Sequence, residues 1–335
     1  MTLPDLRFIA LNQWLRTQLA GDFTLSLISG DASFRRYYRV ITPKSSFIAV
    51  DSPSELVPVL PFVNLSKAYA AEGINVPNVI AFSNRDGFML LSDLGDLQLG
   101  SCLNNDNVAT WYKDALLLLP LIIEVTEANG SRLTIYDVDF VYRELAIFTD
   151  WLLDCHLKLT IDGDTEDMLK AAFSLLADNA IEQPKGGMHR DYHSRNLMVK
   201  DDELWVIDFQ DAVVGPITYD AVSLLRDCYV RWNDALTIEL MTFHFNLLLQ
   251  YEYLPSKTTF AQYQRWFDLM GLQRHIKAAG IFARLHHRDG KSGYLKDIPL
   301  TLEYIRDISA CYPELKAFHL WVKNVLIPSF LVMKE

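Results

Sequence analysis

The sequence predicts an α+β protein with a small antiparallel β lobe at its N-terminus and a larger, mainly helical C-terminal lobe. Three observations support this fold class. The chain has 335 residues, enough for about two domains of roughly 100–200 residues each. Short strand-like segments gather in residues 23–91. Helix-like segments dominate after residue 95, except in a strand-rich island at residues 186–214. We therefore expect one domain at residues 1–94 and a second at residues 95–335.

The N-terminal lobe is expected to begin with a helix and to continue as strands. Residues 4–20 place Leu6, Ile9 and Trp14 on one face at helical spacing, and Gly21 ends this segment. Prolines and turn residues then separate shorter segments. We expect a helix at residues 62–71, a strand beginning at Pro77, and further strands at residues 23–29, 34–41, 47–50 and 88–91.

The C-terminal lobe contains the most apolar stretch of the chain, at residues 115–123. Pro120 interrupts this stretch and Glu124 ends it, so it is much shorter than the ~20 residues that span a membrane. We expect a buried helix with a kink or a break at the proline. Helices are also expected up to about residue 183 and from Asp220 to the end of the chain.

The net charge of −11 argues against nucleic acid or an anionic membrane surface as a partner. Four cysteines without a close-paired spacing do not make a disulfide framework in a chain of this length. The first residues lack the basic start and apolar core of a signal peptide. We expect a cytoplasmic monomer that acts on a small molecule.

The strand-rich island carries a spaced set of polar side chains. His189, Asp191 and Asn196 follow the pattern H-x-D-x-x-x-x-N, and a later apolar strand ends in Asp208 before a phenylalanine. Phosphoryl transfer depends on positioning and charge stabilisation more than on covalent chemistry. A carboxylate can accept the proton of the attacking hydroxyl, and amide and carboxylate oxygens are suitable Mg²⁺ ligands. The pattern therefore predicts Asp191 as the catalytic base and Asn196 and Asp208 as metal ligands.

Each of these residues by itself is typical of a turn or a cap. Only the joint spacing, together with the strand that follows it, points to catalysis. His189 is expected to be structural, with its ring packed under the loop and hydrogen-bonded to the backbone. The sequence leaves the role of His193 undecided, with a solvated loop histidine as the default.

The island, together with the segment at residues 215–220, resembles the aminoglycoside phosphotransferase and choline kinase group of enzymes. The resemblance covers residues 23 to 300 and implies a protein-kinase-like bilobal fold that uses ATP and Mg²⁺. It implies that Asp191 is the base, that Asn196 and Asp208 hold Mg²⁺, and that Asp220 caps a helix and braces the catalytic loop.

Several loops outside this core resemble the bacterial kinases that phosphorylate the anomeric hydroxyl of N-acetylmuramate and N-acetylglucosamine in cell-wall recycling. They include residues 30–39, which stand where kinases cover the phosphates, and residues 90–95 at the expected lobe connector. The residues expected to contact ATP are Gly30, Asp31, Ala32, Ser33, Phe34, Arg35, Arg36, Ser92 and Leu94.

The third strand departs from the usual kinase pattern, because it has no lysine to pair with the phosphates and ends in Asp51. An acid beside phosphates would be repulsive, so Asp51 is expected to point away or to serve another role. Backbone N–H groups at residues 31–34 could form an anion nest instead. Arg35 or Arg36 could also reach the phosphates, and strand alternation places these two on opposite faces.

Acceptor contacts are expected from residues in the C-terminal lobe. Glu144 and Trp151 lie on one predicted helix, where a ring could stack on a sugar and a carboxylate could accept its hydroxyls, although a core stripe fits equally well. A basic segment contains Arg284 and Arg288 and could meet an anionic group or complement a helix C-terminus. The full set is Asp191, Arg195, Glu144, Trp151, Arg284 and Arg288.

Two other functions remain compatible with the sequence. The acceptor could be an aminoglycoside, choline or another amino alcohol in place of a sugar. The chain could also be a nucleotide-binding pseudokinase with a regulatory role, although Asp191, Asn196 and Asp208 are all present.

Overall fold

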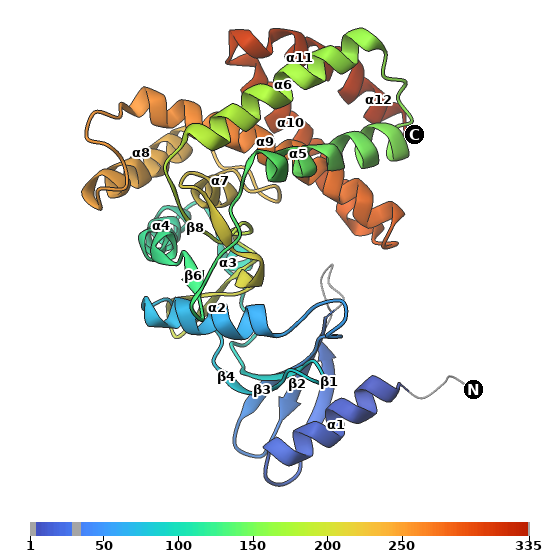
Figure 1. Cartoon of the computed structure of the whole chain (residues 1–335), viewed down its shortest axis with the longest axis vertical. Coiled ribbons are helices and arrows are strands. Elements are labelled where there is room, and N and C mark those ends of the chain that lie inside the picture. The colour runs from blue at the N-terminus through green and yellow to red at the C-terminus, as the bar shows by residue number, and fades with distance from the viewer. Residues whose placement is uncertain (1–4, 29–34, 334–335) are drawn as a thin grey trace. The chain divides into compact units, whose positions relative to one another are not determined.

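The structure, a computed structural model, describes residues 5–28 and 35–333 (Figure 1). These form two compact units that are not continuous in sequence. The first unit contains Met1–Cys102, Glu127–Arg132 and Arg195–Asp211, and the second contains Leu103–Thr126, Leu133–Ser194 and Ala212–Glu335. The domain boundary predicted between residues 94 and 95 stays a prediction.

The first unit is built on an antiparallel sheet of five strands in the order β1-β2-β3-β5-β4. The strands are β1 (Thr24–Ile28), β2 (Arg36–Ile41), β3 (Ser46–Asp51), β4 (Val79–Ser83) and β5 (Phe88–Ser92). Its other elements are α1 (Leu6–Gln18), α2 (Leu60–Ala71), α3 (Leu99–Cys102), β6 (Glu127–Ala128), β7 (Ser131–Arg132), β9 (Leu197–Lys200), β10 (Glu203–Val206) and η2 (Phe209–Asp211).

Helix α1 covers one face of this sheet. Its side chains Leu11 and Leu15 are fully buried against Tyr38 and Val40 of β2 and against neighbouring strands. Alternation along β2 places every second residue on the α1 face, so Arg36 lies on that face as well. Burial of such apolar side chains contributes about 1.5–3 kcal/mol each, which ties the helix to the sheet.

The second unit is mainly helical and has two short strands, β8 (Lys185–Met188) and β11 (Val213–Pro216), which pair antiparallel. Its 28-residue helix α9 (Phe260–His287) packs against the surrounding helices and is buried along most of its length. These helices are α5 (Val138–Ile147), η1 (Phe148–His156), α6 (Gly163–Glu182), α7 (Tyr219–Leu225), α8 (Asp234–Gln250) and α10 (Ile298–Ala310). Helix α4 (Val108–Glu124) packs against α7, α8 and β8.

Helix α4 is buried as expected, and of the two expected effects of Pro120, a kink or a break, the break does not occur. Eight of its residues are buried, and this packing offsets the hydrogen bond that proline cannot donate. The carbonyl of Pro120 accepts a bond of 3.1 Å from the Tyr253 hydroxyl. The hairpin of β6 and β7 also interrupts a stretch that was expected to be helical throughout.

The C-terminal segment Pro313–Val332 is apolar and long enough to pass a length-and-composition test for a membrane span. It comprises η4 (Pro313–Leu315), α11 (Lys316–Trp321), η5 (Val322–Leu326) and α12 (Ile327–Val332). Core helices of soluble proteins pass the same test, and α11 packs against α6 and α10. The segment is therefore weak evidence for a membrane association.

Two buried histidines of the second unit predict a loss of stability in acid. Burial lowers the pKa of His244 and of His275 to about 3 from the ordinary histidine value of about 6.5. Below pH 6.5 the unfolded chain binds protons at both sites and the folded chain does not. The free energy of unfolding should therefore fall as the pH drops from about 6.5 towards 3, by about 1.4 kcal/mol per pH unit for each histidine.

Urea unfolding of the wild type and of His275→Gln, measured at pH 7.5, 6.0 and 5.0, checks this expectation. The ring of His275 stacks on Tyr304 at 4.3 Å, and its Nε2 lies 3.0 Å from the carbonyl oxygen of Arg226. The variant should lose stability at every pH but show a shallower pH dependence. An unchanged slope would mean that His275 does not contribute to the acid transition.

Candidate functional site

The loop that carries Asp191 begins at the end of β8, which is held tightly against α4. A Cβ atom at Gly187 would lie 2.1 Å from the carbonyl oxygen of Ile122 and 2.3 Å from that of Val125. Only glycine permits this close approach of backbones. The glycines before the loop therefore fix where the loop leaves the strand.

Asp220 of α7 and His189 brace the loop from below. Asp220 Oδ2 accepts the backbone N–H of His189 at 2.7 Å, and its Oδ1 accepts that of Arg190 at 3.0 Å. The buried His189 ring accepts the backbone N–H of Asp191 through Nδ1 at 3.2 Å. Arg190 has a φ of 78°, a left-handed conformation that costs a non-glycine residue energy and needs such support.

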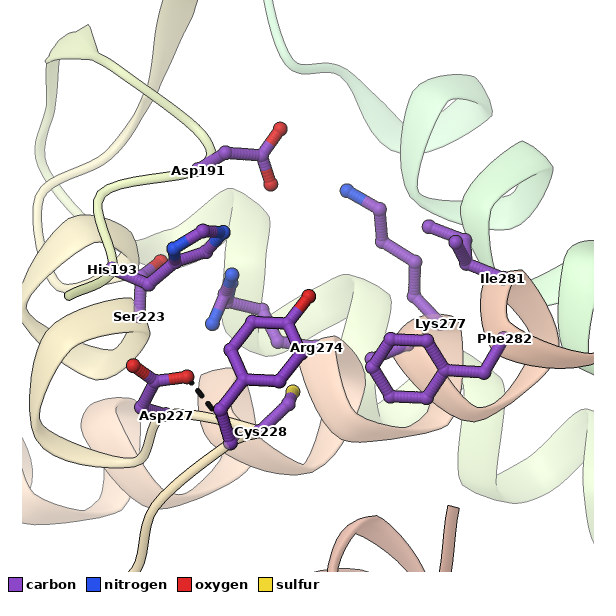
Figure 2. A pocket seen from close by; sticks show the side chains of 11 residues that line it. Asp191, His193, Ser223, Asp227, Cys228, Arg274, Lys277, Ile281 and Phe282 are labelled. Atoms are coloured by element: carbon purple, nitrogen blue, oxygen red, sulfur yellow. Dashed lines mark hydrogen bonds between the residues drawn. The ribbon is translucent and has the colours of Figure 1, made fainter. Parts of the chain in front are cut away.

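Asp191 opens into a pocket between its own loop, α7 and α9 (Figure 2). The pocket has a cavity volume of about 100 Å³ and opens to solvent. Its polar lining includes Asp191, His193, Asp227, Arg274 and Lys277. Its apolar lining includes Tyr229, Ile281 and Phe282. Polar and aromatic groups therefore line the same pocket, a combination that suits a small polar molecule with apolar faces.

The charges around Asp191 keep it ionised. Burial by itself raises the pKa of this carboxyl, but the positive charges of Lys277, His193, Arg190 and Arg274 outweigh burial and lower the pKa to about 2. Asp191 is thus a carboxylate at neutral pH and can accept a hydrogen bond from a hydroxyl group.

The carboxylate of Glu144, on α5, forms ion pairs with two of these cations. Its Oε1 pairs with Arg190 Nη2 at 2.9 Å and with Lys277 Nζ at 2.7 Å. Its Oε2 accepts bonds from the Tyr136 hydroxyl at 2.7 Å and from Gln273 Nε2 at 3.1 Å. Burial raises the pKa of Glu144, yet its two cations and Tyr136 lower it to about 2 overall. Glu144 does not line the pocket, but it holds Lys277, which does.

Asn196 and Asp208 lie in the first unit, on the segment that contains β9 and β10. The N–H of Ile207 donates to the carbonyl of Asn196 at 3.0 Å, so the two residues lie at neighbouring points of one hairpin. Phe209 is fully buried and packs against Phe62 of α2 at 4.7 Å between ring centroids. This anchor holds Asp208, which is exposed and has a φ of 63°.

The donor set of Asn196 and Asp208 fits Mg²⁺, because both side chains offer hard oxygen ligands. In the described residues, no group of three or more His, Cys, Asp or Glu side chains could hold a metal ion. The pair of Asn196 and Asp208 is not such a group, because it has only one carboxylate and its other member is an amide. Mg²⁺ commonly takes its other ligands from phosphates and water, so two protein ligands are sufficient.

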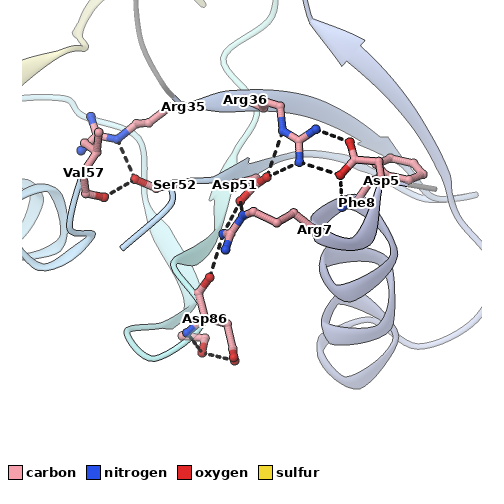
Figure 3. A network of polar contacts seen from close by, with 10 residues as sticks. Asp5, Arg7, Phe8, Arg35, Arg36, Asp51, Ser52, Val57 and Asp86 are labelled. Atoms are coloured by element: carbon pink, nitrogen blue, oxygen red, sulfur yellow. Dashed lines mark hydrogen bonds and ion pairs between the residues drawn. The ribbon is translucent and has the colours of Figure 1, made fainter. Parts of the chain in front are cut away.

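Asp51, the acid on the third strand, has a structural role on the α1 face of the sheet (Figure 3). It is fully buried and accepts bonds from Arg7 Nε at 2.7 Å and from Arg36 Nη2 at 2.6 Å. Arg36 also pairs with Asp5, whose pKa it lowers to about 2. Asp51 and Arg36 therefore tie the start of α1 to the sheet.

Arg35 lies on the opposite side of the same strand end. It is buried, and its Nε donates to the Ser52 hydroxyl at 3.2 Å, which in turn donates to the Val57 carbonyl (Figure 3). Burial raises the pKa of Tyr37; the Arg35 guanidinium lowers it, and the Asp208 carboxylate raises it. The charges of Arg35 and Asp208 therefore both act on Tyr37 within the first unit.

The other residues predicted to contact ATP divide into two sets. Gly30, Asp31, Ala32, Ser33 and Phe34 lie outside the described residues. Ser92 ends β5, where its hydroxyl accepts the backbone N–H of Asn78 at 2.9 Å, and Leu94 is buried just beyond it. Every described residue predicted for nucleotide or metal lies in the first unit: Arg35, Arg36, Ser92, Leu94, Asn196 and Asp208.

The remaining predicted acceptor residues do not line the pocket around Asp191. Trp151 is half-buried on η1, and Arg195 belongs to the first unit. Arg284 is half-buried near the end of α9, and Arg288 pairs with Asp289 at 2.9 Å.

The structure instead brings Arg274, Lys277, Ile281 and Phe282 to the pocket from α9. These four residues are three, four and one positions apart, a spacing that places them on one face of the helix. The sequence prediction did not include them, because it was based on the basic segment that follows them on the same helix. The two cations, three residues apart in an otherwise apolar stretch, are the signal that could have found them.

Known proteins resemble this chain in sequence. The model of the phosphotransferase enzyme family matches residues 24–245. An N-acetylmuramate/N-acetylglucosamine kinase of Pseudomonas aeruginosa is 37% identical over 322 residues, which cover 93% of this chain and 94% of that protein. A protein of the same name from Neisseria meningitidis is 36% identical over 314 residues, which cover 92% of this chain and 93% of its own.

The fold has counterparts among solved structures. An ethanolamine kinase of Plasmodium vivax matches with a TM-score of 0.65 at 11% identity and covers 93% of this chain and 89% of its own. This likeness confirms the predicted kinase-like α+β fold. The family model spans well over half of the sequence, and the relatives cover nearly all of it. The chain therefore belongs to the phosphotransferase enzyme family, as its resemblance to aminoglycoside phosphotransferases predicted.

Proposed function

We propose that this enzyme transfers the γ-phosphoryl group of ATP to the anomeric hydroxyl of an N-acetylated amino sugar, N-acetylmuramate or N-acetylglucosamine. The observation that carries the proposal is the ionised Asp191 at the rim of a pocket that is lined by cations and aromatic rings. The names of relatives that match nearly the whole chain support the choice of acceptor. A cytoplasmic, monomeric enzyme is part of the proposal.

Asp191 is proposed to accept a hydrogen bond from the acceptor hydroxyl and to receive its proton. A carboxyl with a pKa of about 2 is a weak base, so it would not remove this proton before the new bond forms. In a loose transition state the hydroxyl becomes acidic only as its oxygen bonds to phosphorus. Asp191 therefore acts first by orienting the hydroxyl and receives the proton late in the reaction.

On the donor side, Asn196 and Asp208 would hold Mg²⁺, which neutralises phosphate charge when it is bound. Arg35 is proposed as the group that takes over from the missing third-strand lysine, because its charge and that of Asp208 both act on Tyr37, whereas Arg36 is engaged by Asp5 and Asp51. Backbone groups near Ser92 and Leu94 would meet the base of the nucleotide.

On the acceptor side, Tyr229 and Phe282 form an aromatic pair with ring centroids 6.1 Å apart. Such rings pack against the apolar C–H faces of a sugar. The pocket contains one lysine and one arginine, Lys277 and Arg274. Their positive charges disfavour a cationic acceptor such as choline or an aminoglycoside. Of the acids in the lining, Asp227 is engaged by the N–H and hydroxyl of Ser194 and by the N–H of Tyr229.

An acceptor screen tests the proposal. Purified enzyme with ATP and Mg²⁺ is given N-acetylmuramate, N-acetylglucosamine, kanamycin or choline, and ADP release and the phosphorylated product are measured. We expect turnover with the two amino sugars, no turnover with the two cationic acceptors, and loss of activity when EDTA removes the metal. Turnover with kanamycin or choline alone would overturn the assignment. ATP binding without turnover on any acceptor would support a pseudokinase instead.

A further inference from the structure

We propose that Arg274 forms a carboxylate-binding subsite in the acceptor pocket, so that the enzyme recognises an acidic sugar through this residue. The inference rests on the proposed function and adds the residue that would distinguish an acidic acceptor from its neutral analogue. N-acetylmuramate carries a lactyl carboxylate that N-acetylglucosamine lacks, so the two proposed acceptors differ in the group that this subsite would bind.

The buried cations around the pocket differ in their partners. Lys277 and Arg190 both pair with Glu144, at 2.7 and 2.9 Å. Arg226, at the end of α7, pairs with Asp268 of α9. Within residues 5–28 and 35–333, no carboxylate lies within salt-bridge distance of Arg274. Arg274 is thus a buried guanidinium whose charge is not matched by a contacting acid.

The neutral contacts of Arg274 leave part of its hydrogen-bonding capacity unused. Only 8% of the residue is exposed, and its guanidinium carbon lies 4.9 Å from the centre of the Tyr219 ring. Its Nε has no hydrogen-bond partner among the described residues. Burying a charge without a contacting counter-charge is costly, and proteins usually avoid it unless function requires it. An anionic ligand group would supply the missing partner.

The position of Arg274 suits this role. It lines the same pocket as Asp191, and Figure 2 shows both side chains around one opening, with Lys277 beside them. The flat guanidinium binds a carboxylate through two parallel N–H donors, which a lysine cannot do. His193, whose Nδ1 is buried without a hydrogen-bond partner among the described residues, lines the same pocket and offers a second polar contact.

Two alternative roles give different results and can be separated. Arg274 could serve only to keep Asp191 ionised, since its charge is one of those that act on this carboxyl. In that case it would affect every acceptor equally. The anionic group could instead bind Arg284, another arginine of α9, which has no carboxylate partner within the described chain but is half-buried and outside the pocket lining.

The test compares kcat/KM for N-acetylmuramate and N-acetylglucosamine in the wild type, Arg274→Gln, Arg274→Lys and the matched control Arg284→Gln. For Arg274→Gln we expect the ratio of the two values to fall by roughly 10- to 100-fold, from the usual strength of charge-assisted hydrogen bonds. The value for N-acetylglucosamine should fall by less than the value for N-acetylmuramate, and urea unfolding at pH 7.5 shows whether the variant is folded. Arg274→Lys should restore part of the ratio, and Arg284→Gln should leave it unchanged.

Three results would overturn the subsite. An equal fall for both sugars in Arg274→Gln would mean that the residue acts through Asp191 or through the fold. An unchanged ratio would mean that no carboxylate reaches Arg274. A ratio that falls only in Arg284→Gln would place the subsite at the end of α9. Failure of the wild type to phosphorylate either sugar would instead overturn the proposed function, and the subsite with it.

Discussion

Replacing Asp191 by asparagine should lower kcat by about 10²- to 10⁴-fold, the usual contribution of a positioned acid or base. Asparagine has nearly the same shape but cannot receive the proton. The KM for ATP should change little, because the described residues proposed to bind ATP lie in the other unit. Steady-state kinetics with the best acceptor at saturating ATP measures both quantities.

Asp227→Asn is the matched control for this prediction. Asp227 lines the same pocket, but its oxygens accept bonds from Ser194 and Tyr229, and an asparagine retains an oxygen that can accept one of these. Its kcat should stay within about tenfold of the wild type. Full turnover in Asp191→Asn, or a larger loss in Asp227→Asn, would show that the wrong carboxylate has been chosen.

Because its pKa is about 2, Asp191 by itself should produce no loss of activity between pH 5 and 8.

Replacing Glu144 by glutamine should destabilise the protein by about 3–5 kcal/mol, the usual cost of removing one partner from a buried ion pair. Glutamine keeps the size of the side chain and can still bond the Tyr136 hydroxyl. However, it leaves Arg190 and Lys277 without the carboxylate that both contact. The free energy of unfolding in urea at pH 7.5 measures the loss.

Glu166→Gln provides the control, because Glu166 also pairs with a lysine but on the surface of α6. An exposed pair of this kind contributes little to stability, because solvent screens its charges. Equal losses in the two variants would mean that the network around Glu144 does not support the fold. A large loss of activity without loss of stability in Glu144→Gln would instead favour direct contact with the substrate.

Regular local patterns allowed much of the fold to be predicted. Strands β1, β2 and β3 and the helix α1 that covers them follow from apolar periodicity and turn residues, and the structure contains them within a few residues of the expected bounds. Helix α4 is buried as expected but does not break at Pro120, because tertiary burial of its apolar face keeps the helix continuous where local propensity favours a break.

The sequence by itself determined the family, the kinase-like fold and the spacing of Asp191, Asn196 and Asp208, because these depend on residues that are close along the chain. Only the tertiary structure decided which charges meet. It assigned Arg36 to Asp51 and Asp5, and it placed Arg274 beside Asp191 from a helix more than eighty residues away. The physical reason is that ion pairing and burial depend on contacts between distant segments, and a one-dimensional pattern does not contain those distances.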